Sequence, residues 1–233
     1  MIKKKIKKIL EPLTYLYKNF IDRFAFKAYS QEGEDMILRR MFEGKSIGFY
    51  VDVGAHHPKR FSNTYFFYQR GWTGINIDAM PGSMKIFNKL RKKDINLEIP
   101  ISSNEQDLTF FSFNEPALNS FSMELSRERD GKNGYFIKDE IHLSTQKLST
   151  VLDNFLPNGT EIDFLSIDVE GLDFEVLYSN NWEKYKPKVI LIEILSTDLA
   201  EIEHNETAIF LKLRGYSLYA KTVNTFIFTL RGL

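Results

Sequence analysis

The sequence predicts an α/β fold in which a mostly parallel sheet carries helices on both faces. Short apolar runs alternate with amphipathic segments over most of the chain, and such alternation favours parallel strands joined by right-handed crossovers. The apolar run at 48–54 ends in an acid and a glycine, which suits a buried parallel strand. At 233 residues, 43% hydrophobic and 27% charged, the chain is long enough to bury the core of one such domain.

The first half of the domain predicts an opening helix followed by a β-α-β-α-β order. Residues 30–42 (SQEGEDMILRRMF) are typical of a helix capped by Ser30, with Gly33 as an irregularity inside it. The elements expected after it are a strand at 48–54, a helix at 64–71, a strand at 73–78, a helix at 80–93 and a strand at 95–102.

Residues from about 104 to 146 are less regular. A strand is expected at 108–113, and the polar stretch 114–136 has little periodicity, which is typical of a long functional loop such as a lid. Alternation then resumes and ends in an antiparallel hairpin at the edge of the sheet. The elements expected there are helices at 148–156, 173–180 and 206–216 and strands at 162–171, 188–195, 216–222 and 225–230.

Charge and cysteine content exclude several classes of protein. Lys and Arg number 31, as do Asp and Glu, so the chain lacks the excess positive charge that non-specific nucleic-acid binding needs. The absence of Cys excludes disulfides, a thiolate nucleophile and a zinc site with Cys ligands.

Residues 1–27 hold eight basic and two acidic side chains, and their apolar residues recur at helical spacing. We therefore expect a basic amphipathic segment at 1–28 and one domain at 29–233. Two interpretations of the segment remain open: it packs on the domain or on a second subunit of a homodimer, or it lies on an anionic membrane surface. Polar residues interrupt it, so we expect neither a cleaved signal peptide nor a spanning helix, and a cytoplasmic protein, peripheral at the inner face of the membrane under the second interpretation.

The ends of the first two strands indicate a nucleoside site. Open parallel sheets bind ligands beyond the carboxyl ends of their strands, where Asp52, Gly54 and Ala55 follow the first strand. Asp78 ends the second strand 24 residues after Gly54, where an acid can accept hydrogen bonds from both hydroxyls of a ribose. Pro58 stands where a dinucleotide fingerprint would have a later glycine, which disfavours a pyrophosphate and nicotinamide chemistry. The alternative role for Asp78 is a helix N-cap.

Residues in this order resemble the FkbM family of class I S-adenosylmethionine-dependent methyltransferases. The resemblance is carried by SQEGEDMIL, FYVDVGAHHPKRFSNTYFFYQRGWTGINIDAMPGSM, the ALNSFS loop and DFLSIDVEGLDFEVL with VILIEI after it. It runs from about Ser30 to the C-terminus. It implies a Rossmann-like fold with a seven-stranded sheet and S-adenosylmethionine as methyl donor, and it says much less about the acceptor.

The resemblance also implies roles for residues around the donor. These are Gly54 and Ala55 under the methionine part, Asp52 near its ammonium, Asp78 at the ribose, Met80 against the adenine face, Ile101 and Ser102 at the adenine edge, and Gln31 closing the pocket from the other side.

Acids follow the remaining parallel strands, Asp168 and Glu170 after the fourth and Glu193 at the end of the fifth. Three carboxylates beside the donor can bind the acceptor, serve as a base or hold a divalent cation through oxygen ligands. The alternative for Asp168 and Glu170 is charge stabilisation of the helix that follows them.

Two histidines and two asparagines complete the predicted site. His56 and His57 follow the glycine turn, where either can remove a hydroxyl proton, unless they are ordinary loop residues. Asn63 and Asn119 lie next to serines and suit a polyhydroxylated acceptor, with capping and turn formation as the alternative.

These observations together predict methyl transfer from S-adenosylmethionine to a hydroxyl, with a glycan or small molecule as partner and no nucleic acid. The expected acceptor is a sugar of a surface polysaccharide, a lipopolysaccharide or a glycosylated metabolite. One alternative is the same fold acting on a phosphate-type or phosphoramidate oxygen. The other is a catalytically silent protein that keeps a nucleoside pocket as a scaffold.

Overall fold

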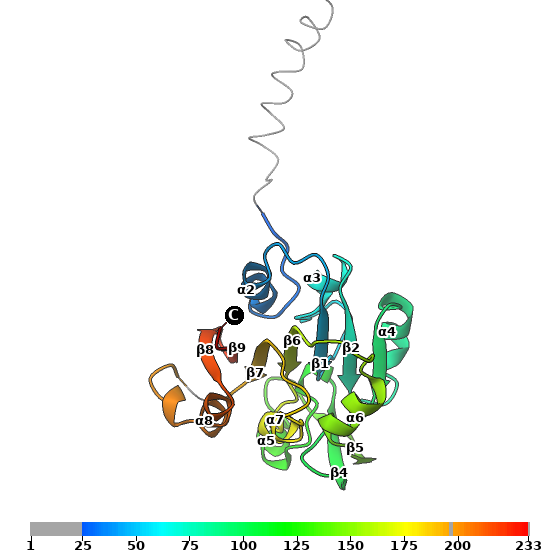
Figure 1. Cartoon of the computed structure of the whole chain (residues 1–233). Coiled ribbons are helices and arrows are strands. Elements are labelled where there is room, and N and C mark those ends of the chain that lie inside the picture. Colours follow the sequence, from blue (N-terminus) through cyan, green and yellow to red (C-terminus); the bar gives the residue numbers. More distant parts are fainter. Residues whose placement is uncertain (1–24, 196–197, 233) are drawn as a thin grey trace, which may run out of the picture.

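A seven-stranded sheet forms the centre of the computed structural model, which describes residues 25–195 and 198–232 (Figure 1). Its strands are β1 (Phe49–Val53), β2 (Thr73–Asp78), β3 (Ile95–Glu98), β6 (Phe164–Ile167), β7 (Val189–Glu193), β8 (Tyr216–Lys221) and β9 (Thr225–Leu230). Their order is β3-β2-β1-β6-β7-β9-β8, and β9 runs antiparallel to both of its neighbours while the first five pair in parallel. The predicted fold class, a Rossmann-like sheet that ends in an antiparallel hairpin, is confirmed.

The central strands are continuously apolar because both of their faces are covered. Every residue of β1 and β6 is buried, and Val51 and Leu165 are at most 1% exposed. The chain leaves β1 toward β2 and β3 and then returns to β6 on the other side of β1. This reversal of strand order leaves a crevice beyond the carboxyl ends of β1 and β6.

Helices cover both faces of the sheet. On one face Leu152, Val176 and Leu211 share a core with Val51. On the other face aromatic side chains pack together around Trp72, which is 1% exposed. The first face carries α6 (Leu148–Phe155), α7 (Asp173–Tyr178) and α8 (Glu206–Leu213), the second carries α2 (Glu34–Met41) and α3 (Tyr65–Tyr68), and α4 (Met84–Leu90) packs beside β3.

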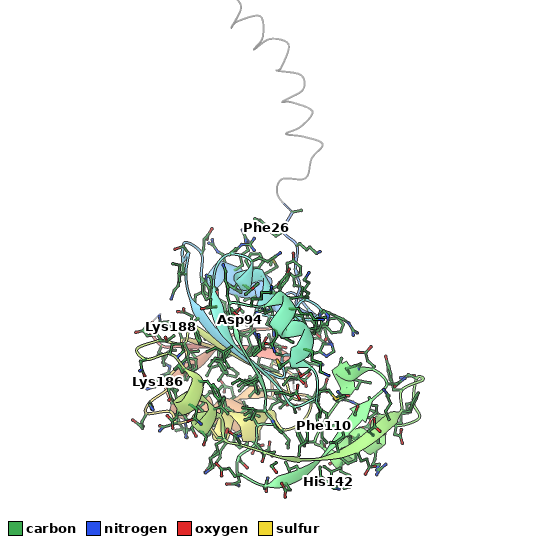
Figure 2. The ribbon with its side chains drawn as sticks, turned by 90° about the vertical axis from the view of Figure 1, so that its right-hand side faces the viewer. Phe26, Asp94, Phe110, His142, Lys186 and Lys188 are labelled. Atoms are coloured by element: carbon green, nitrogen blue, oxygen red, sulfur yellow. The ribbon has the colours of Figure 1, made fainter. Side chains whose placement is uncertain are left out.

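Residues 107–144 form an insertion with its own two-stranded antiparallel sheet, which carries Phe110 on one strand and His142 on the other (Figure 2). It contains β4 (Asp107–Phe113), the 3-10 helix η1 (Pro116–Leu118), α5 (Met123–Arg129) and β5 (Ile137–Ser144). The prediction of β4 is confirmed, but the expected irregular polar loop is wrong, since it contains α5 and leads into β5. Most of β5 is exposed, so its sequence carries only a weak strand signal.

Several helices are shorter than the sequence predicts. The prediction of Ser30 as N-cap is wrong: α2 begins only after Gly33, which has a φ of 90°, and Ser30 Oγ instead accepts the N–H groups of Gly33 and Asp35. The helix expected at 80–93 begins at Met84, after a turn, and the short 3-10 helix η2 (Ile202–His204) precedes α8.

The predictions for the N-terminal segment fall mostly on residues 1–24, which lie outside the described residues. The division into 1–28 and 29–233 and the contact with a membrane or a second subunit stay predictions. Among the helices that the structure describes, none has the length and apolar character needed to span a bilayer.

A buried ion pair joins the sheet to the turn after β1. The side chains of Arg91 and Asp94 are fully buried, with Nε of Arg91 2.8 Å from Oδ2 of Asp94. The guanidinium also donates to the carbonyl of Pro58 and to Oγ1 of Thr64, and Asp94 accepts from the hydroxyl of Tyr50. This network fixes the segment 58–64, which forms one side of the crevice.

We expect Asp94→Asn to lower the free energy of unfolding by roughly 3–5 kcal/mol, because it leaves the Arg91 cation buried without its counter-ion. Urea denaturation measures the loss. The matched control is Glu140→Gln, which breaks the exposed pair with Arg127 (2.8 Å) and should cost less than about 1 kcal/mol. Equal losses in the two variants would contradict the role of the buried network.

Candidate functional site

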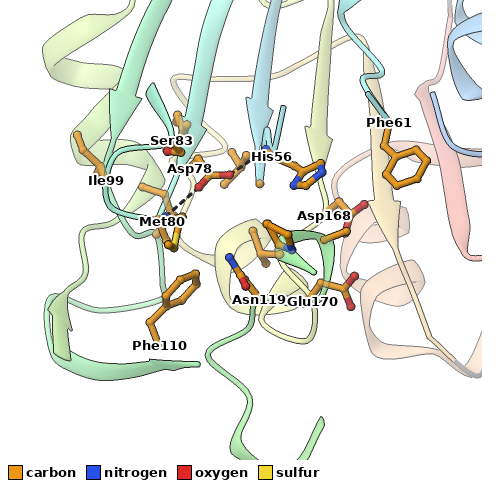
Figure 3. A pocket seen from close by; sticks show the side chains of 18 of the residues that line it. His56, Phe61, Asp78, Met80, Ser83, Ile99, Phe110, Asn119, Asp168 and Glu170 are labelled. Carbon is orange, nitrogen blue, oxygen red and sulfur yellow. Dashed lines mark hydrogen bonds between the residues drawn. The ribbon is translucent and has the colours of Figure 1, made fainter. Parts of the chain in front are cut away.

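A pocket of about 340 Å³ lies beyond the carboxyl ends of β1, β2 and β6 (Figure 3). Side chains from the strand ends form its floor, and Phe110 and Phe121 of the insertion form one wall. Figure 3 shows Met80, Ile99 and Phe110 at one end and Asp168, Glu170 and Phe61 toward the other. Of the predicted site residues, the pocket brings together Gln31, Gly54, His56, Asp78, Met80, Ile101, Asn119, Asp168 and Glu170.

The remaining predicted residues are not among those that line this pocket: Asp52, Ala55, His57, Asn63, Ser102 and Glu193. Asp52 is buried and accepts a hydrogen bond from Thr64 Oγ1 (3.1 Å), and Asn63 donates to Ser166 Oγ (3.1 Å). These contacts tie the turn after β1 to the sheet.

Gly54 is required where β1 meets the chain after β6. Its φ of 83° is unfavourable for other residues, and a Cβ atom at this position would lie 1.7 Å from the carbonyl oxygen of Asp168. The N–H groups of Gly54 and Ala55 both donate to the carbonyl of Ile77 at 3.0 Å. The glycine therefore brings the ends of β1, β2 and β6 into contact.

Asp78 organises the turn from the end of β2. Its Oδ2 accepts the N–H of His56 and its Oδ1 accepts the N–H of Met80, both at 2.8 Å. Burial raises the pKa of Asp78, and these two hydrogen bonds oppose the rise. Each carboxylate oxygen can accept a second hydrogen bond, so Asp78 keeps capacity for two hydroxyl groups of a ligand.

The two histidines have different positions. Nδ1 of His57 accepts the N–H groups of Lys59 and Arg60, at 3.1 and 3.0 Å, which closes the turn. His56 lines the pocket, and its Nε2 is buried without a hydrogen-bond partner among the described residues. Burial and the nearby charge of Arg60 lower the pKa of His56, so its imidazole is neutral at pH 7.

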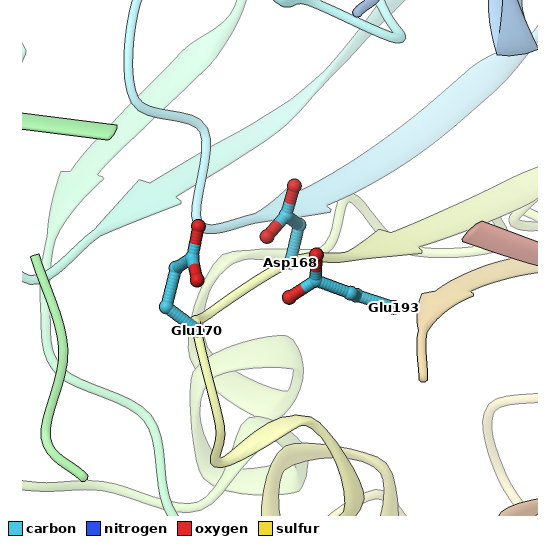
Figure 4. A group of neighbouring side chains, drawn as sticks. All are labelled: Asp168, Glu170 and Glu193. Atoms are coloured by element: carbon cyan, nitrogen blue, oxygen red, sulfur yellow. The ribbon is translucent and has the colours of Figure 1, made fainter. Parts of the chain in front are cut away.

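Three carboxylates meet at the ends of β6 and β7 (Figure 4). Asp168, Glu170 and Glu193 each offer an oxygen within 4.8 Å of the others. Burial and the charges of Glu193 and Glu170 raise the pKa of Asp168 well above its usual range. The Asp168 side chain is exposed to the open pocket. Repulsion from Glu193 and Glu170 therefore contributes more to its raised pKa than burial does. Burial and the charges of Glu170 and Asp173 raise the pKa of Glu193 to about 8.

The insertion holds Glu170, the member of this trio with a strained backbone. Glu170 has a φ of 55°, its carbonyl accepts from Ser120 Oγ at 2.5 Å, and its carboxylate pairs with Arg129 at 2.7 Å. A Cβ atom on Gly171 would lie 2.7 Å from Leu125, so α5 packs directly on this loop. The sequence did not indicate Arg129 as a site residue, because a charged run on an irregular segment does not show which acid it meets.

Gln31 reaches the pocket from a segment tied to the C-terminal hairpin. Glu32 accepts the N–H groups of Val223 and Asn224, and Glu34 accepts the hydroxyl of Thr222. The turn between β8 and β9 thereby holds the SQEGED segment against the end of the sheet.

The sequence matches the model of a known protein family over most of its length. The model described as "Methyltransferase FkbM domain" matches residues 52–218, well over half of the chain. The sequence has no match among curated proteins. The structure of a proposed RNA methyltransferase from Pyrococcus horikoshii is similar to it with a TM-score of 0.43 and 12% sequence identity, over 93% of this chain and 98% of that chain.

We expect Glu193→Gln to become progressively more stable than the unaltered protein as the pH rises from 5 to 8. An acid whose pKa is higher in the folded protein than its usual 4.5 binds more protons when folded, so raising the pH through that interval favours unfolding. Glutamine cannot ionise, so the variant does not lose free energy of unfolding over this pH interval. We expect the loss in the unaltered protein to be about 2 kcal/mol, after allowance for the partial exposure of Glu193.

The measurement is urea denaturation of both proteins at pH 5, 6, 7 and 8. The matched control is Glu203→Gln on the exposed 3-10 helix η2, whose stability relative to the unaltered protein should not vary with pH. A Glu193→Gln difference that is constant with pH would contradict the raised pKa.

Proposed function

Because this chain belongs to the FkbM methyltransferase family, we propose that it transfers a methyl group from S-adenosylmethionine to a hydroxyl group of a sugar. Methyl transfer follows from the family, and the donor and the acceptor class are the proposal. The observation that carries it is the position of Asp78, which lies at the tip of β2 beside the glycine turn with hydrogen-bonding capacity to spare.

The residues of the pocket fit the donor. Asp78 would hold the ribose hydroxyls, and Met80, Ile99 and Ile101 offer apolar surface for adenine. A volume of about 340 Å³ lies within the range of small-molecule sites. The acids at the opposite end favour a cationic group, and the donor carries a sulfonium and an ammonium.

S-adenosylmethionine supplies an activated methyl group with a neutral thioether as leaving group. The chain's own residues must then align the acceptor oxygen and receive its proton as the O–C bond forms and the C–S bond breaks. We assign the proton to Nε2 of His56, which lines the pocket, is neutral at pH 7 and has no partner among the described residues. His57 supports the turn instead, since two backbone N–H groups occupy its Nδ1.

The acid-rich end suits a polyhydroxylated acceptor. Carboxylate oxygens of Asp168 and Glu170 accept hydrogen bonds from sugar hydroxyls, and Asn119 lies on the insertion wall of the same pocket. The proposed acceptor is a sugar of a surface polysaccharide, lipopolysaccharide or glycosylated metabolite. A phosphate-type or phosphoramidate oxygen is disfavoured, because the same acids repel a dianion unless a cation intervenes.

The same three carboxylates suit a divalent cation, since hard cations bind oxygen ligands. A cation there would neutralise the repulsion that raises the pKa values of Asp168 and Glu193, and it would supply Lewis-acid polarisation of the acceptor hydroxyl. A chelator followed by magnesium tests this version of the site.

We expect Asp78→Ala to abolish binding of S-adenosylmethionine in calorimetry, because it removes both acceptors for the ribose hydroxyls. Asp78→Asn keeps the shape of the side chain and should bind at least tenfold more weakly. Asp139→Ala, on the exposed strand β5, is the matched control and should bind as the unaltered protein does. Unchanged affinity in both Asp78 variants would refute the assignment of the donor site.

We expect His56→Asn to lower kcat at least a hundredfold, because the hydroxyl proton loses its acceptor. His57→Asn removes only a turn contact and should have a much smaller effect on kcat. The measurement is the initial rate of methyl transfer to the best acceptor among a panel of methyl glycosides. The affinity for S-adenosylhomocysteine should remain within twofold in both variants.

The pH dependence of this reaction provides a second readout. Because the pKa of His56 lies below its usual 6.5, the base stays neutral and kcat should stay level on acidification to about pH 6.5 before it falls. Equal rates for His56→Asn and His57→Asn would exclude His56 as the base and leave the carboxylates.

A further inference from the structure

Backbone strain is concentrated at the pocket. Four described residues other than glycine have a positive φ: His56 (52°), Phe61 (55°), Asn133 (54°) and Glu170 (55°). Three of them line the pocket, and Asn133 lies in a turn of the insertion. Such conformations cost of order 1–3 kcal/mol each and are typical of functional sites.

Phe61 is the least expected of the three, because a bulky side chain with a positive φ is an outlier. The packing of the ring does not explain it, since the residue is 40% exposed. Glycine or asparagine would adopt the same backbone conformation with less strain. Burial in the core therefore does not account for an aromatic ring at this position.

The neighbours of Phe61 hold its ring in one orientation. The guanidinium of Arg60 lies 4.3 Å from the ring centroid, and Arg60 makes two hydrogen bonds to Glu115 of the insertion, at 2.9 and 3.2 Å. The ring of His56 lies 6.2 Å away at an angle of 21°. A partly exposed aromatic ring is thus fixed beside the candidate base.

The place of Phe61 in the pocket indicates what it meets. Figure 3 shows it toward the end that contains Asp168, away from Met80 and Phe110 at the proposed adenine end. This end therefore combines an apolar aromatic surface with carboxylates that accept hydrogen bonds. A saturated sugar ring matches both, because it offers C–H groups on one face and hydroxyl groups at its edge.

We propose that Phe61 is the platform on which a neutral pyranose ring of the acceptor packs, with the hydroxyl to be methylated directed toward His56. The inference rests on the proposed function, because it names the substrate class of the same pocket. Phe61 is a specificity-determining residue, since it contacts the acceptor and takes no part in the proton transfer.

The test measures glycoside binding without turnover. Protein saturated with S-adenosylhomocysteine is examined by saturation-transfer NMR with methyl pyranosides of glucose, galactose, mannose and rhamnose, and with phenol as an aromatic hydroxyl probe. We expect transfer to the ring C–H protons of at least one glycoside. Phe61→Leu keeps an apolar side chain but loses the aromatic face, so it should bind that glycoside about fivefold to tenfold more weakly.

Two further variants separate stacking from folding. Phe61→Trp keeps an aromatic face and should retain binding. Phe155→Leu changes a phenylalanine of similar exposure (38%) on α6, outside the pocket lining, and should bind as the unaltered protein does. Affinity for S-adenosylhomocysteine should be unchanged in all three.

Glycoside binding that is equal in Phe61→Leu and in the unaltered protein would overturn the platform while leaving the proposed donor site intact. Binding of phenol with no binding of any glycoside would overturn the assigned substrate class. If the unaltered protein bound no S-adenosylhomocysteine, the proposed function would fail first, and the platform with it.

Discussion

The contact between the ends of β1 and β6 is the constraint on which the pocket depends. The carbonyl oxygen of Asp168 occupies the space that a side chain on residue 54 would need, so the two strand ends meet only at a glycine. This contact directs the glycine turn and the acids after β6 into the same crevice. Asp78 holds the turn from the third strand end through the N–H of His56. Backbone contacts therefore set the shape of the site.

Because the strand ends lie so close together, the acids that follow them repel one another. Nearby cations compensate only part of this repulsion. Asp173 accepts the N–H groups of Val169 and Gly171 and so draws the acidic loop inward, where burial raises its own pKa to about 7. Arg129 compensates Glu170, but Asp168 and Glu193 have no comparable cation beside them among the described ion pairs. A cation beside Asp168 and Glu193 would offset the repulsion that raises their pKa values, so this end of the pocket favours cationic ligands, in agreement with the donor proposed here.

Sequence patterns predicted the parts of the molecule that follow from local rules. The parallel strands were recognisable because burial on both faces makes them apolar, and Asp78 and Gly54 because they end such strands. The insertion was not, since β5 is mostly exposed and pairs only with β4. The distinction between His56 and His57 was also inaccessible, because it depends on which ring nitrogen meets the backbone of the turn. Nor does any residue pattern indicate the positive φ of Phe61 or the partner of Arg129.

The two ends of the pocket differ in how far the sequence predicts them. The more predictable end is the proposed donor site, and the less predictable end is the proposed acceptor site. The proposed donor end is built on strand tips and a glycine turn, where a change of side chain disturbs the sheet itself. The opposite end is joined by contacts between side chains of the insertion and of loops, such as Arg60 with Glu115 and Arg129 with Glu170. Contacts of this kind can change without disturbing the sheet, so this end can adapt to different acceptors while the donor end stays fixed. Under the proposed function, residues of the insertion would therefore determine which acceptor hydroxyl is presented to His56.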